Sequence, residues 1–128
     1  FLADKSQLIQ AFLNIAKNAL QALSAQVEEG KDGIITLRTR VLRQFTIGHS
    51  KHRLVLSVDI IDNGPGIPKE AIQNIFYPMI SGRPDGTGLG LSITQSILTK
   101  HDGLVECESK PSETKFTVYL PLEQNNDL

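Results

Sequence analysis

The chain has 128 residues, a length typical of one domain, and 40% of them are hydrophobic, which is enough for one sizeable core. Its formal net charge of −1 gives no electrostatic reason to expect nucleic acid or an anionic membrane as a partner, and the absence of tryptophan argues against a base-stacking surface. No apolar run approaches the length of a membrane span, and the single Cys107 excludes an internal disulfide. We therefore expect one soluble, cytoplasmic domain over residues 1–128.

A long helix is predicted first, over about residues 5–29, because apolar side chains recur there at helical spacing. Asp4 or Ser6 is a suitable cap for its start, and the glycines within residues 30–33 would end it. The apolar stripe is wide, so one side of this helix is expected to be well buried.

Two strands and a short helix are predicted next. Residues 34–44 and 53–62 are rich in Val, Ile, Leu and Thr, and we expect them to pair as a hairpin. The polar, basic residues 48–52 would form its solvated tip. Pro68 suits the first turn of a helix, which predicts a short second helix over residues 70–76.

The last part of the chain begins with an irregular segment, residues 77–87, whose length is typical of a functional loop. A third helix over residues 89–101 and two strands over 104–109 and 115–120 would follow, with residues 123–128 as a frayed tail. This order predicts an α/β fold, a two-layer sandwich in which about three helices cover one face of a mixed, mostly antiparallel sheet.

Glycines alternate with other residues over 86–91, Gly-Thr-Gly-Leu-Gly-Leu, at the start of the predicted third helix. Backbone without Cβ can approach a ligand closely, and the free N–H groups and the dipole at a helix start favour an anion. These features are typical of a phosphate-binding loop. The motif alone is weak evidence, and it is neither a Walker loop nor a Rossmann fingerprint because the residues around it do not match either pattern.

The segment Asp62–Ile67, Asp-Asn-Gly-Pro-Gly-Ile, directly follows the second predicted strand. By itself it is typical of a glycine–proline turn, in which Asp and Asn are ordinary residues. The functional interpretation is that Asp62 accepts a hydrogen bond from an exocyclic amine, while Gly64 and Gly66 let a flat ring lie against the backbone. An ionised carboxylate cannot donate to a carbonyl edge, so such a site would select adenine over guanine.

Two asparagines, Asn14 and Asn18, lie four residues apart inside the first predicted helix and so share one of its faces. A polar edge on an amphipathic helix is the simplest explanation. The functional interpretation is that their amide oxygens point into a cleft and hold a hydrated Mg²⁺, which prefers oxygen ligands and phosphates.

Together and in this order, the three motifs resemble the N, G1 and G2 boxes of the GHKL ATP-binding (Bergerat) fold, which gyrase, Hsp90, histidine kinases and MutL share. The resemblance covers nearly the whole chain, residues 4–121. Residues 76–79, Phe-Tyr-Pro-Met, stand where histidine kinases carry their F box. Thr114 begins a segment similar to the last motif of the family, whose Thr approaches the adenine through water.

The resemblance implies a role for each matching residue, with ATP and Mg²⁺ as the ligands. Asn18 would ligate Mg²⁺, Asn14 would lie beside the triphosphate, and Asp62 would bind the adenine amino group. Residues 77–85 would form a mobile lid, in which Arg83 is either a phosphate contact or a solvated loop residue. The other residues implied to bind nucleotide are Gly64, Gly66, Ile67, Tyr77, Gly86, Thr87, Gly88, Leu89, Gly90, Leu91 and Thr114.

One position separates the branches of this family. Hydrolytic members carry a Glu four residues before the Mg²⁺-binding Asn, where it activates water; here that residue is Asn14, which is not a base. The sequence therefore resembles the ATP-binding catalytic domain of a sensor histidine kinase. The alternatives that remain open are a hydrolytic GHKL ATPase, a nucleotide-binding interaction module without transfer activity and, more weakly, an anti-sigma serine kinase.

A finer similarity, carried by residues 13–23, 76–83 and 86–93, is to nitrogen-regulation sensor kinases of the NtrB type. Met79, in place of a second Phe, favours that subfamily, whereas Glu113 stands where a Gly is usual before the Thr. The similarity implies a PII-type signalling protein and an NtrC-type response regulator as partners.

The histidines His49, His52 and His101 offer no phosphoacceptor, because none precedes an acidic residue on an upstream helix; we expect all three to be solvated surface residues. The acceptor would be a histidine on a dimerisation domain outside this chain. The sequence thus predicts a kinase domain that phosphorylates a separately supplied acceptor.

Overall fold

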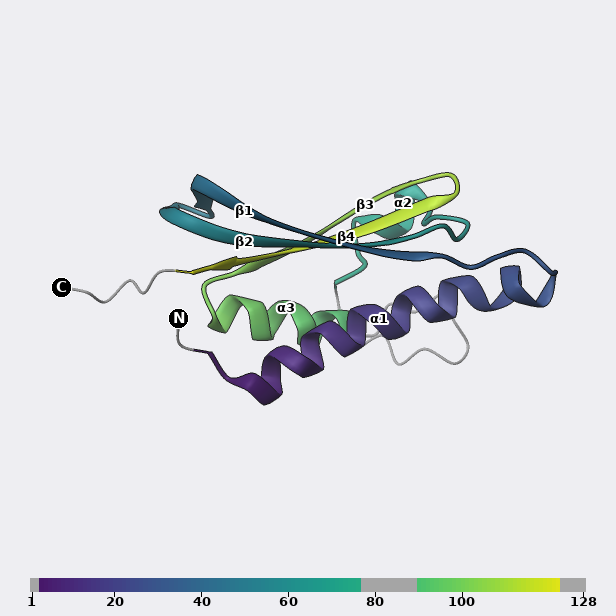
Figure 1. Cartoon of the computed structure of the whole chain (residues 1–128), viewed down its shortest axis with the longest axis horizontal. Helices are drawn as coiled ribbons and strands as arrows, with labels where there is room; N and C mark the ends of the chain where they lie inside the picture. Colours follow the sequence, from purple (N-terminus) through teal and green to yellow (C-terminus); the bar gives the residue numbers. More distant parts are fainter. Residues whose placement is uncertain (1–2, 77–89, 123–128) are drawn as a thin grey trace.

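The computed structural model describes residues 3–76 and 90–122. Its elements, in chain order, are α1 (Lys5–Glu28), β1 (Ile35–Ile47), β2 (Ser50–Asp62), α2 (Lys69–Ile72), α3 (Gly90–Lys100), β3 (Leu104–Lys110) and β4 (Glu113–Pro121). The strands form one sheet in the order β1-β2-β4-β3, and α1 and α3 lie against one face of it (Figure 1). The predicted two-layer α/β sandwich is confirmed.

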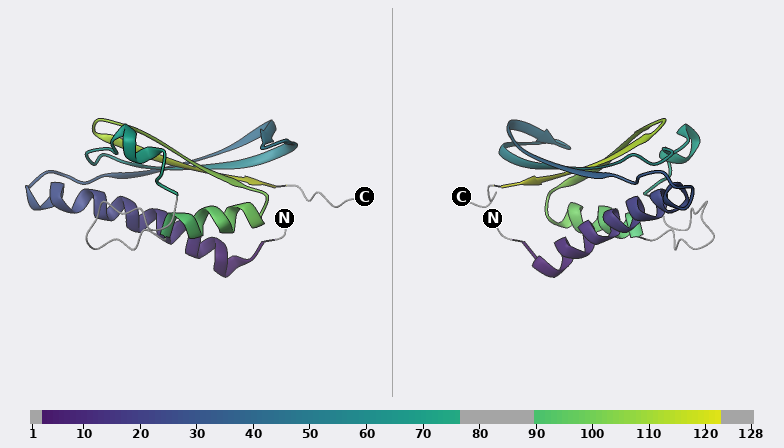
Figure 2. Two further views of the ribbon diagram at one scale, coloured as in Figure 1. Left: turned by 180° about the vertical axis from the view of Figure 1, so that it is seen from behind. Right: turned by 45° about the vertical axis from the view of Figure 1, so that its right-hand side comes forward.

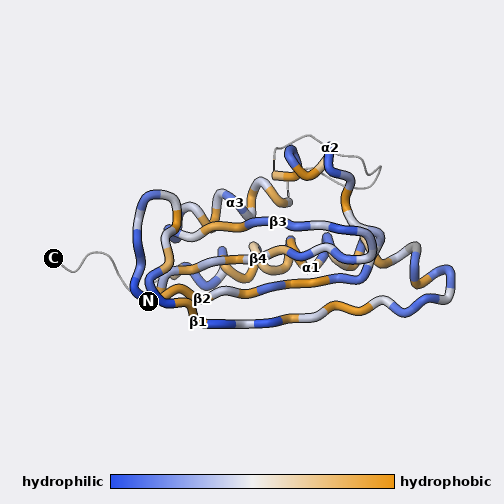
Figure 3. The backbone as a smooth tube through the Cα atoms, turned by 90° about the horizontal axis from the view of Figure 1, so that it is seen from above, coloured by the Kyte–Doolittle hydropathy of each residue, from blue (hydrophilic) through white to orange (hydrophobic). Residues whose placement is uncertain are grey.

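Two details of the layers differ from the expectation. All three strand pairings among the described residues are antiparallel, so the described sheet is not mixed. The helix α2 contacts β3 and lies beside the edge of the sheet, so of the described helices only α1 and α3 cover the face (Figure 3). The reason is the single turn of α2, which has no buried residue to place under the sheet.

Both ends of α1 follow from local sequence. The Asp4 carboxylate accepts a hydrogen bond from the Gln7 backbone amide at 3.1 Å, which makes Asp4 rather than Ser6 the cap. At the other end Gly30 takes a φ of 83°, its amide donates to the Val27 carbonyl, and the next amide donates to Gln26. This is the Schellman pattern that a glycine after a helix favours. The predicted helix and both of its boundaries are confirmed.

The face of the sheet beneath the helices changes character along its length. Residues of β2, β4 and β3 lie side by side in two apolar rows, first Val58, Val118 and Val105, then Ile60, Phe116 and Cys107. These rows pack against the buried Ile15 of α1 and Leu98 of α3 to form the core. Because side chains alternate between faces, the next row on the same face is polar: Asp62, Thr114 and Ser109.

The opposite face carries a buried carboxylate of its own. Asp59 accepts hydrogen bonds from Arg38 at 2.9 Å and from Thr117 at 2.7 Å, and Arg40 lies 4.0 Å away. Burial alone would raise the pKa of Asp59, but the hydrogen bonds from Thr117 and Arg38 and the positive charges of Arg38 and Lys115 together lower it. Asp59 is therefore ionised and holds β1 to β2 and β4.

The hairpin of β1 and β2 is longer than predicted. Ile47 pairs with Ser50, so only Gly48 and His49 form the turn, and Gly48 has the positive φ (62°) that a type II′ turn needs at its first central position. The polar residues 50–52 belong to β2 because their backbone groups pair with β1 whatever their side chains.

One histidine prediction is wrong. His52 is 2% exposed and lines a pocket of about 230 Å³ with residues that include Thr99 and Gly103, because the hairpin brings it against the end of α3. His101 is half-buried: its Nε2 accepts from the Asp4 amide at 3.0 Å, which places the proton of the neutral ring on Nδ1, 2.9 Å from the Ile97 carbonyl. His49 is exposed, as predicted.

The second helix is shorter than predicted. It begins directly after Pro68, as expected, but α2 ends at Ile72 and residues 73–76 form turns. Phe76 then packs edge-on against Phe116, with 6.3 Å between the ring centroids. The strands β3 and β4 and the helix α3 match their predictions to within about two residues.

Candidate functional site

The polar row lies at one end of the covered face and contains two of the residues predicted to recognise a base. Asp62, the last residue of β2, is 2% exposed, and its Oδ1 accepts a hydrogen bond from the Gly64 amide at 3.0 Å. Thr114 lies directly across from Asp62 on β4 and is 3% exposed. The register therefore places a carboxylate and a hydroxyl side by side, as the motifs implied.

The glycines of the turn after β2 are required by space. A Cβ on Gly64 would lie 3.0 Å from Asp62 Oδ1 and 3.2 Å from the Ala22 carbonyl of α1. Gly66 has a φ of 88°, and a Cβ there would lie 2.6 Å from the Lys110 carbonyl. This turn thus packs directly against α1 and against the turn between β3 and β4.

Ser109 fastens that turn to the sheet. Its Oγ accepts a hydrogen bond from the Ile67 amide at 2.7 Å and lies 3.1 Å from Thr114 Oγ1 and 3.2 Å from the Glu113 carbonyl. Glu113 stands where a glycine is usual, and the residue before it, Ser112, takes the left-handed conformation in this turn, with a φ of 69°. Thr114 is in register with Asp62 and Ser109.

The N box faces the start of α3. The Asn14 side-chain amide donates to the Gly90 carbonyl at 3.1 Å, and the buried Thr94 hydroxyl donates to the same carbonyl at 3.0 Å. Asn18, one turn further along α1, is half-buried. The two asparagines thus lie on the side of α1 that faces the first turn of α3, where the glycine motif ends.

A cysteine lies in the apolar row next to the site. Cys107 pairs with Phe116, and burial, together with the charges of Asp62 and Glu108, raises the pKa of its thiol to about 12. The thiol is therefore protonated at neutral pH and is not a nucleophile.

The remaining predicted ligands divide into two sets. Gly90 and Leu91 are the first two residues of α3, and Leu91 packs against the core. Among the described residues, a Cβ on Gly90 would meet the Asn14 side chain, at 3.9 Å, which is an ordinary contact distance. Six predicted residues lie outside the described ranges: Tyr77, Arg83, Gly86, Thr87, Gly88 and Leu89.

Two residues of this region were not singled out by the motifs. Ser109 lies on a predicted strand, where a serine resembles any exposed polar position. Asn63 extends the pairing of β1 with β2 through its side chain, which accepts from the Ile34 amide at 2.8 Å and donates to the Asp32 carbonyl at 3.2 Å. Its place beside Asp62 in a glycine turn was the available signal.

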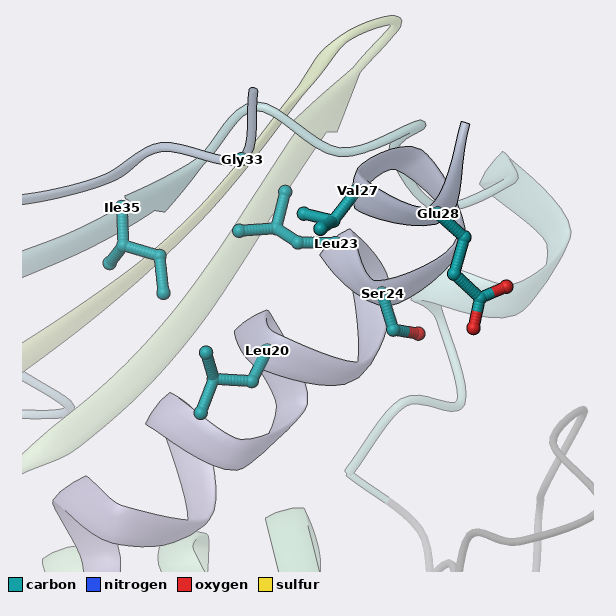
Figure 4. Close-up of a pocket in the computed structure, with 7 residues that line it drawn as sticks. All are labelled: Leu20, Leu23, Ser24, Val27, Glu28, Gly33 and Ile35. Carbon is teal, nitrogen blue, oxygen red and sulfur yellow. The ribbon is translucent and has the colours of Figure 1, made fainter. Parts of the chain in front are cut away.

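A separate apolar pocket of about 550 Å³ lies on the other side of α1 (Figure 4). It is lined by the last turns of α1, including Leu20, Leu23 and Val27, and by Gly33 and Ile35 at the start of β1. None of the described residues predicted to bind nucleotide lines this pocket, and Figure 2 shows the start of β1 near the end of α1, with α3 beside the first half of α1. Within the described ranges, no helix is long and apolar enough to cross a membrane.

Comparison with known proteins agrees with these motifs. A family model described as histidine kinase-, DNA gyrase B-, and HSP90-like ATPase matches residues 3–124. The sensory histidine kinase/phosphatase NtrB of Vibrio alginolyticus is 51% identical over 121 residues, which are 94% of this chain and 33% of that protein. NtrB of Klebsiella oxytoca is 48% identical over the same shares. The chain thus spans about a third of the length of the curated relatives it matches.

Solved structures show the same fold. The catalytic domain of histidine kinase ThkA superposes with a TM-score of 0.73 at 27% identity, over 93% of this chain and 68% of that chain. The mycobacterial sensor histidine kinase MprB superposes with a TM-score of 0.74 at 24% identity, over 94% and 75% of the two chains. On the strength of the family match, which covers every described residue, this chain belongs to the histidine kinase-, DNA gyrase B- and HSP90-like ATPases.

Proposed function

We propose that this chain binds Mg·ATP and transfers the γ-phosphoryl group to a histidine on a separate dimerisation domain, as the kinase part of a two-component nitrogen-regulation system. The observation that carries the proposal is the buried Asp62 carboxylate at the polar end of a face that is otherwise apolar. A carboxylate accepts hydrogen bonds, so it can bind an exocyclic amine. We assign it the exocyclic amine of adenine.

The base would lie over the turn after β2. An ionised carboxylate accepts from the 6-amino group of adenine but cannot donate to the 6-oxo group of guanine. Gly64 and Gly66 have no room for a side chain, because a Cβ at either position would meet protein atoms that include the Ala22 and Lys110 carbonyls. These features support ATP rather than GTP as the substrate.

The triphosphate would lie between α1 and the start of α3. The α3 helix begins at Gly90 in the described residues, and the first turn of a helix has amides without intrahelical partners and a partial positive charge, which favour phosphate. Asn18 fits a Mg²⁺ ligand, since amide oxygens are hard donors of the kind Mg²⁺ accepts alongside phosphate oxygens and water. The bound Mg²⁺ would supply neutralisation of the phosphate charge.

The chemistry of the Asn14 side chain favours phosphoryl transfer over ATP hydrolysis. Its amide nitrogen already donates to Gly90, and an amide is not a base that can activate water. In such a site the protein contributes position and charge, and the nucleophile is the imidazole of the acceptor domain. A hydrolytic ATPase remains the competing function, because the family includes such enzymes.

The partners follow from the relatives, which are named sensory histidine kinase/phosphatase NtrB. We propose the phosphoacceptor dimerisation domain of the same kinase as the direct partner, and an NtrC-type response regulator and a PII-type protein as partners of the complete system. We place the domain in the cytoplasm, where ATP and such regulators are found.

The test mixes this chain, Mg²⁺ and γ-labelled ATP with a separate acceptor domain from an NtrB-type kinase. Acid-labile, base-stable label on the acceptor is expected, and Asn18→Ala or Asp62→Ala should abolish it. Asp59→Asn, on the opposite face, is the matched control and should retain transfer. Free phosphate released without the acceptor, with no label transferred, would instead establish the hydrolytic ATPase.

A further inference from the structure

Three elements meet at the hydroxyl of Ser109. Its Oγ lies 2.7 Å from the Ile67 amide of the turn after β2, 3.1 Å from Thr114 Oγ1 on β4 and 3.2 Å from the Glu113 carbonyl. Ser109 and Thr114 are also direct cross-strand partners, and Thr114 is in turn the cross-strand partner of Asp62. A single hydroxyl thus connects the turn that shapes the base site with the threonine that lines it.

The direction of each hydrogen bond follows from the atoms available. A serine hydroxyl has one proton and two lone pairs. The Ile67 amide can only donate, and the Glu113 carbonyl can only accept. All three contacts are satisfied together in one arrangement, in which Ser109 donates to Glu113 and accepts from both Ile67 and Thr114.

This arrangement determines what Thr114 can offer a ligand. Its only hydroxyl proton is used by Ser109, so the oxygen that remains for the site is an acceptor. Asp62, beside it, is also an acceptor. The two neighbouring groups together suit a donor with two N–H bonds, such as an exocyclic amine or an amine with its attached water.

We propose that Ser109 is a positioning residue for base selection. Its Oγ accepts a hydrogen bond from the Thr114 hydroxyl, which leaves the Thr114 oxygen as a hydrogen-bond acceptor next to Asp62. The proposal rests on the proposed function, since it concerns how the same site distinguishes a 6-amino from a 6-oxo purine. Without the Ser109 oxygen, the Thr114 hydroxyl is free to rotate and to donate to a 6-oxo group.

The experiment measures the dissociation constants of Mg·ATP and Mg·ITP, which differ at position 6 of the purine. The wild-type chain should prefer ATP. Ser109→Ala should reduce the ratio of ATP to ITP affinity about 5–10-fold, the effect of about one hydrogen bond. Ser109→Thr keeps the hydroxyl on a strand position that tolerates a branched residue, and it should restore the ratio.

Two further variants separate positioning from stability. Thr117→Val removes a buried hydroxyl on the opposite face and should lower the melting temperature while leaving the ratio unchanged. In a Thr114→Val background, Ser109→Ala should have no further effect on the ratio, because it acts through Thr114.

Each outcome of these binding measurements has a different meaning for the role of Ser109. Equal losses for ATP and ITP in Ser109→Ala, or a change of ratio that persists in the Thr114→Val background, would overturn the role of Ser109 and leave the proposed function intact. A wild-type chain that binds neither nucleotide would overturn both. A ratio that falls in Ser109→Ala and returns in Ser109→Thr would establish the positioning role.

Discussion

Two buried aspartates lie three residues apart on β2 in different surroundings. Asp59 and Asp62 are 1% and 2% exposed, and because they are an odd number of residues apart they point to opposite faces of the sheet. Asp59 is held by two hydrogen bonds from side chains and by the charge of Arg38, at 2.8 Å. Asp62 accepts from the backbone amide of its own turn, in a row of hydroxyls.

The two buried carboxylates differ in the groups that surround them. A carboxylate neutralised by a guanidinium contributes to structure, since its charge is already balanced within the protein. Asp62 lies instead in a row of hydroxyls at the end of the covered face, where we propose that it binds the ligand. The two aspartates are almost equally buried, so the degree of burial alone does not distinguish them.

The largest effect is expected from a substitution in the turn after Asp62. Gly66→Ala would place a Cβ 2.6 Å from the Lys110 carbonyl at a positive φ, so the turn must shift, and ATP affinity should fall about 100-fold or more, roughly 3 kcal/mol. Titration with a fluorescent ATP analogue measures this. Gly48→Ala is the control: its φ is also positive, but nothing lies within 4 Å, so it should bind ATP normally with a loss of stability of about 1 kcal/mol.

Exchanging each aspartate for asparagine sharpens the comparison. Asp62→Asn should weaken ATP binding about 10–100-fold, since a charge-assisted hydrogen bond contributes about 1.5–3 kcal/mol. Asp59→Asn should leave ATP affinity unchanged and lower the free energy of unfolding by about 1–3 kcal/mol, because Arg38 is half exposed and partly screened. Calorimetric titration measures the ATP affinity of both variants, and urea unfolding measures their stability. Equal losses of ATP affinity in the two variants would contradict the proposal that only Asp62 binds the nucleotide.

Low pH should reduce the difference in stability between the wild-type chain and the Asp59→Asn variant. The pKa of Asp59 is lowered in the folded state, so its contribution to stability is complete above its unfolded pKa of about 3.9 and is lost as the pH falls through the lower folded value. The stability difference between wild type and Asp59→Asn should therefore be constant near neutral pH and shrink below about pH 4. Urea midpoints measured from pH 7 down to pH 2.5 test this, and a difference that grows in acid would show that the pKa is raised instead.

The smallest effect distinguishes the two arginines beside Asp59. Arg38 contacts Asp59 Oδ2 at 2.8 and 2.9 Å, whereas Arg40 lies 4.0 Å from the same oxygen. Arg38→Ala should cost about 1–2 kcal/mol of unfolding free energy, and Arg40→Ala about 0–0.5 kcal/mol, the usual worth of an exposed pair. Thermal unfolding of the two variants in low and high salt makes the comparison; an equal cost would mean that both arginines neutralise the carboxylate.

The sequence predicted the elements that depend on local signals. The apolar period of α1, its Asp4 cap and Gly30 were enough to place a 24-residue helix. The hairpin was underestimated because residues 50–52 are polar, and strand pairing depends on backbone groups that composition does not reveal. The burial of His52 depends on the end of α3 packing against the hairpin, which no local pattern contains.

The motifs of the candidate site could be identified in the sequence, but the arrangement of their residues in space could not. Asp62, Gly64, Gly66 and Thr114 were named from the resemblance, and the structure brings them together. The pairing of Asp62 with Thr114 depends on the register of β2 with β4, which sequence alone did not supply. Ser109 carried no distinct signal, because its importance comes from three partners at other places in the chain.

The protonated thiol of Cys107 also gives the protein an internal reporter of opening. Alkylating reagents react with thiolate, and a pKa of about 12 leaves almost none of it in the folded chain, whereas an unfolded cysteine titrates near 8.5. Since Cys107 is the one cysteine of the chain, the rate of its alkylation at pH 8 should report the fraction of molecules in which β3 and β4 have opened. No label or introduced cysteine is needed to measure such opening.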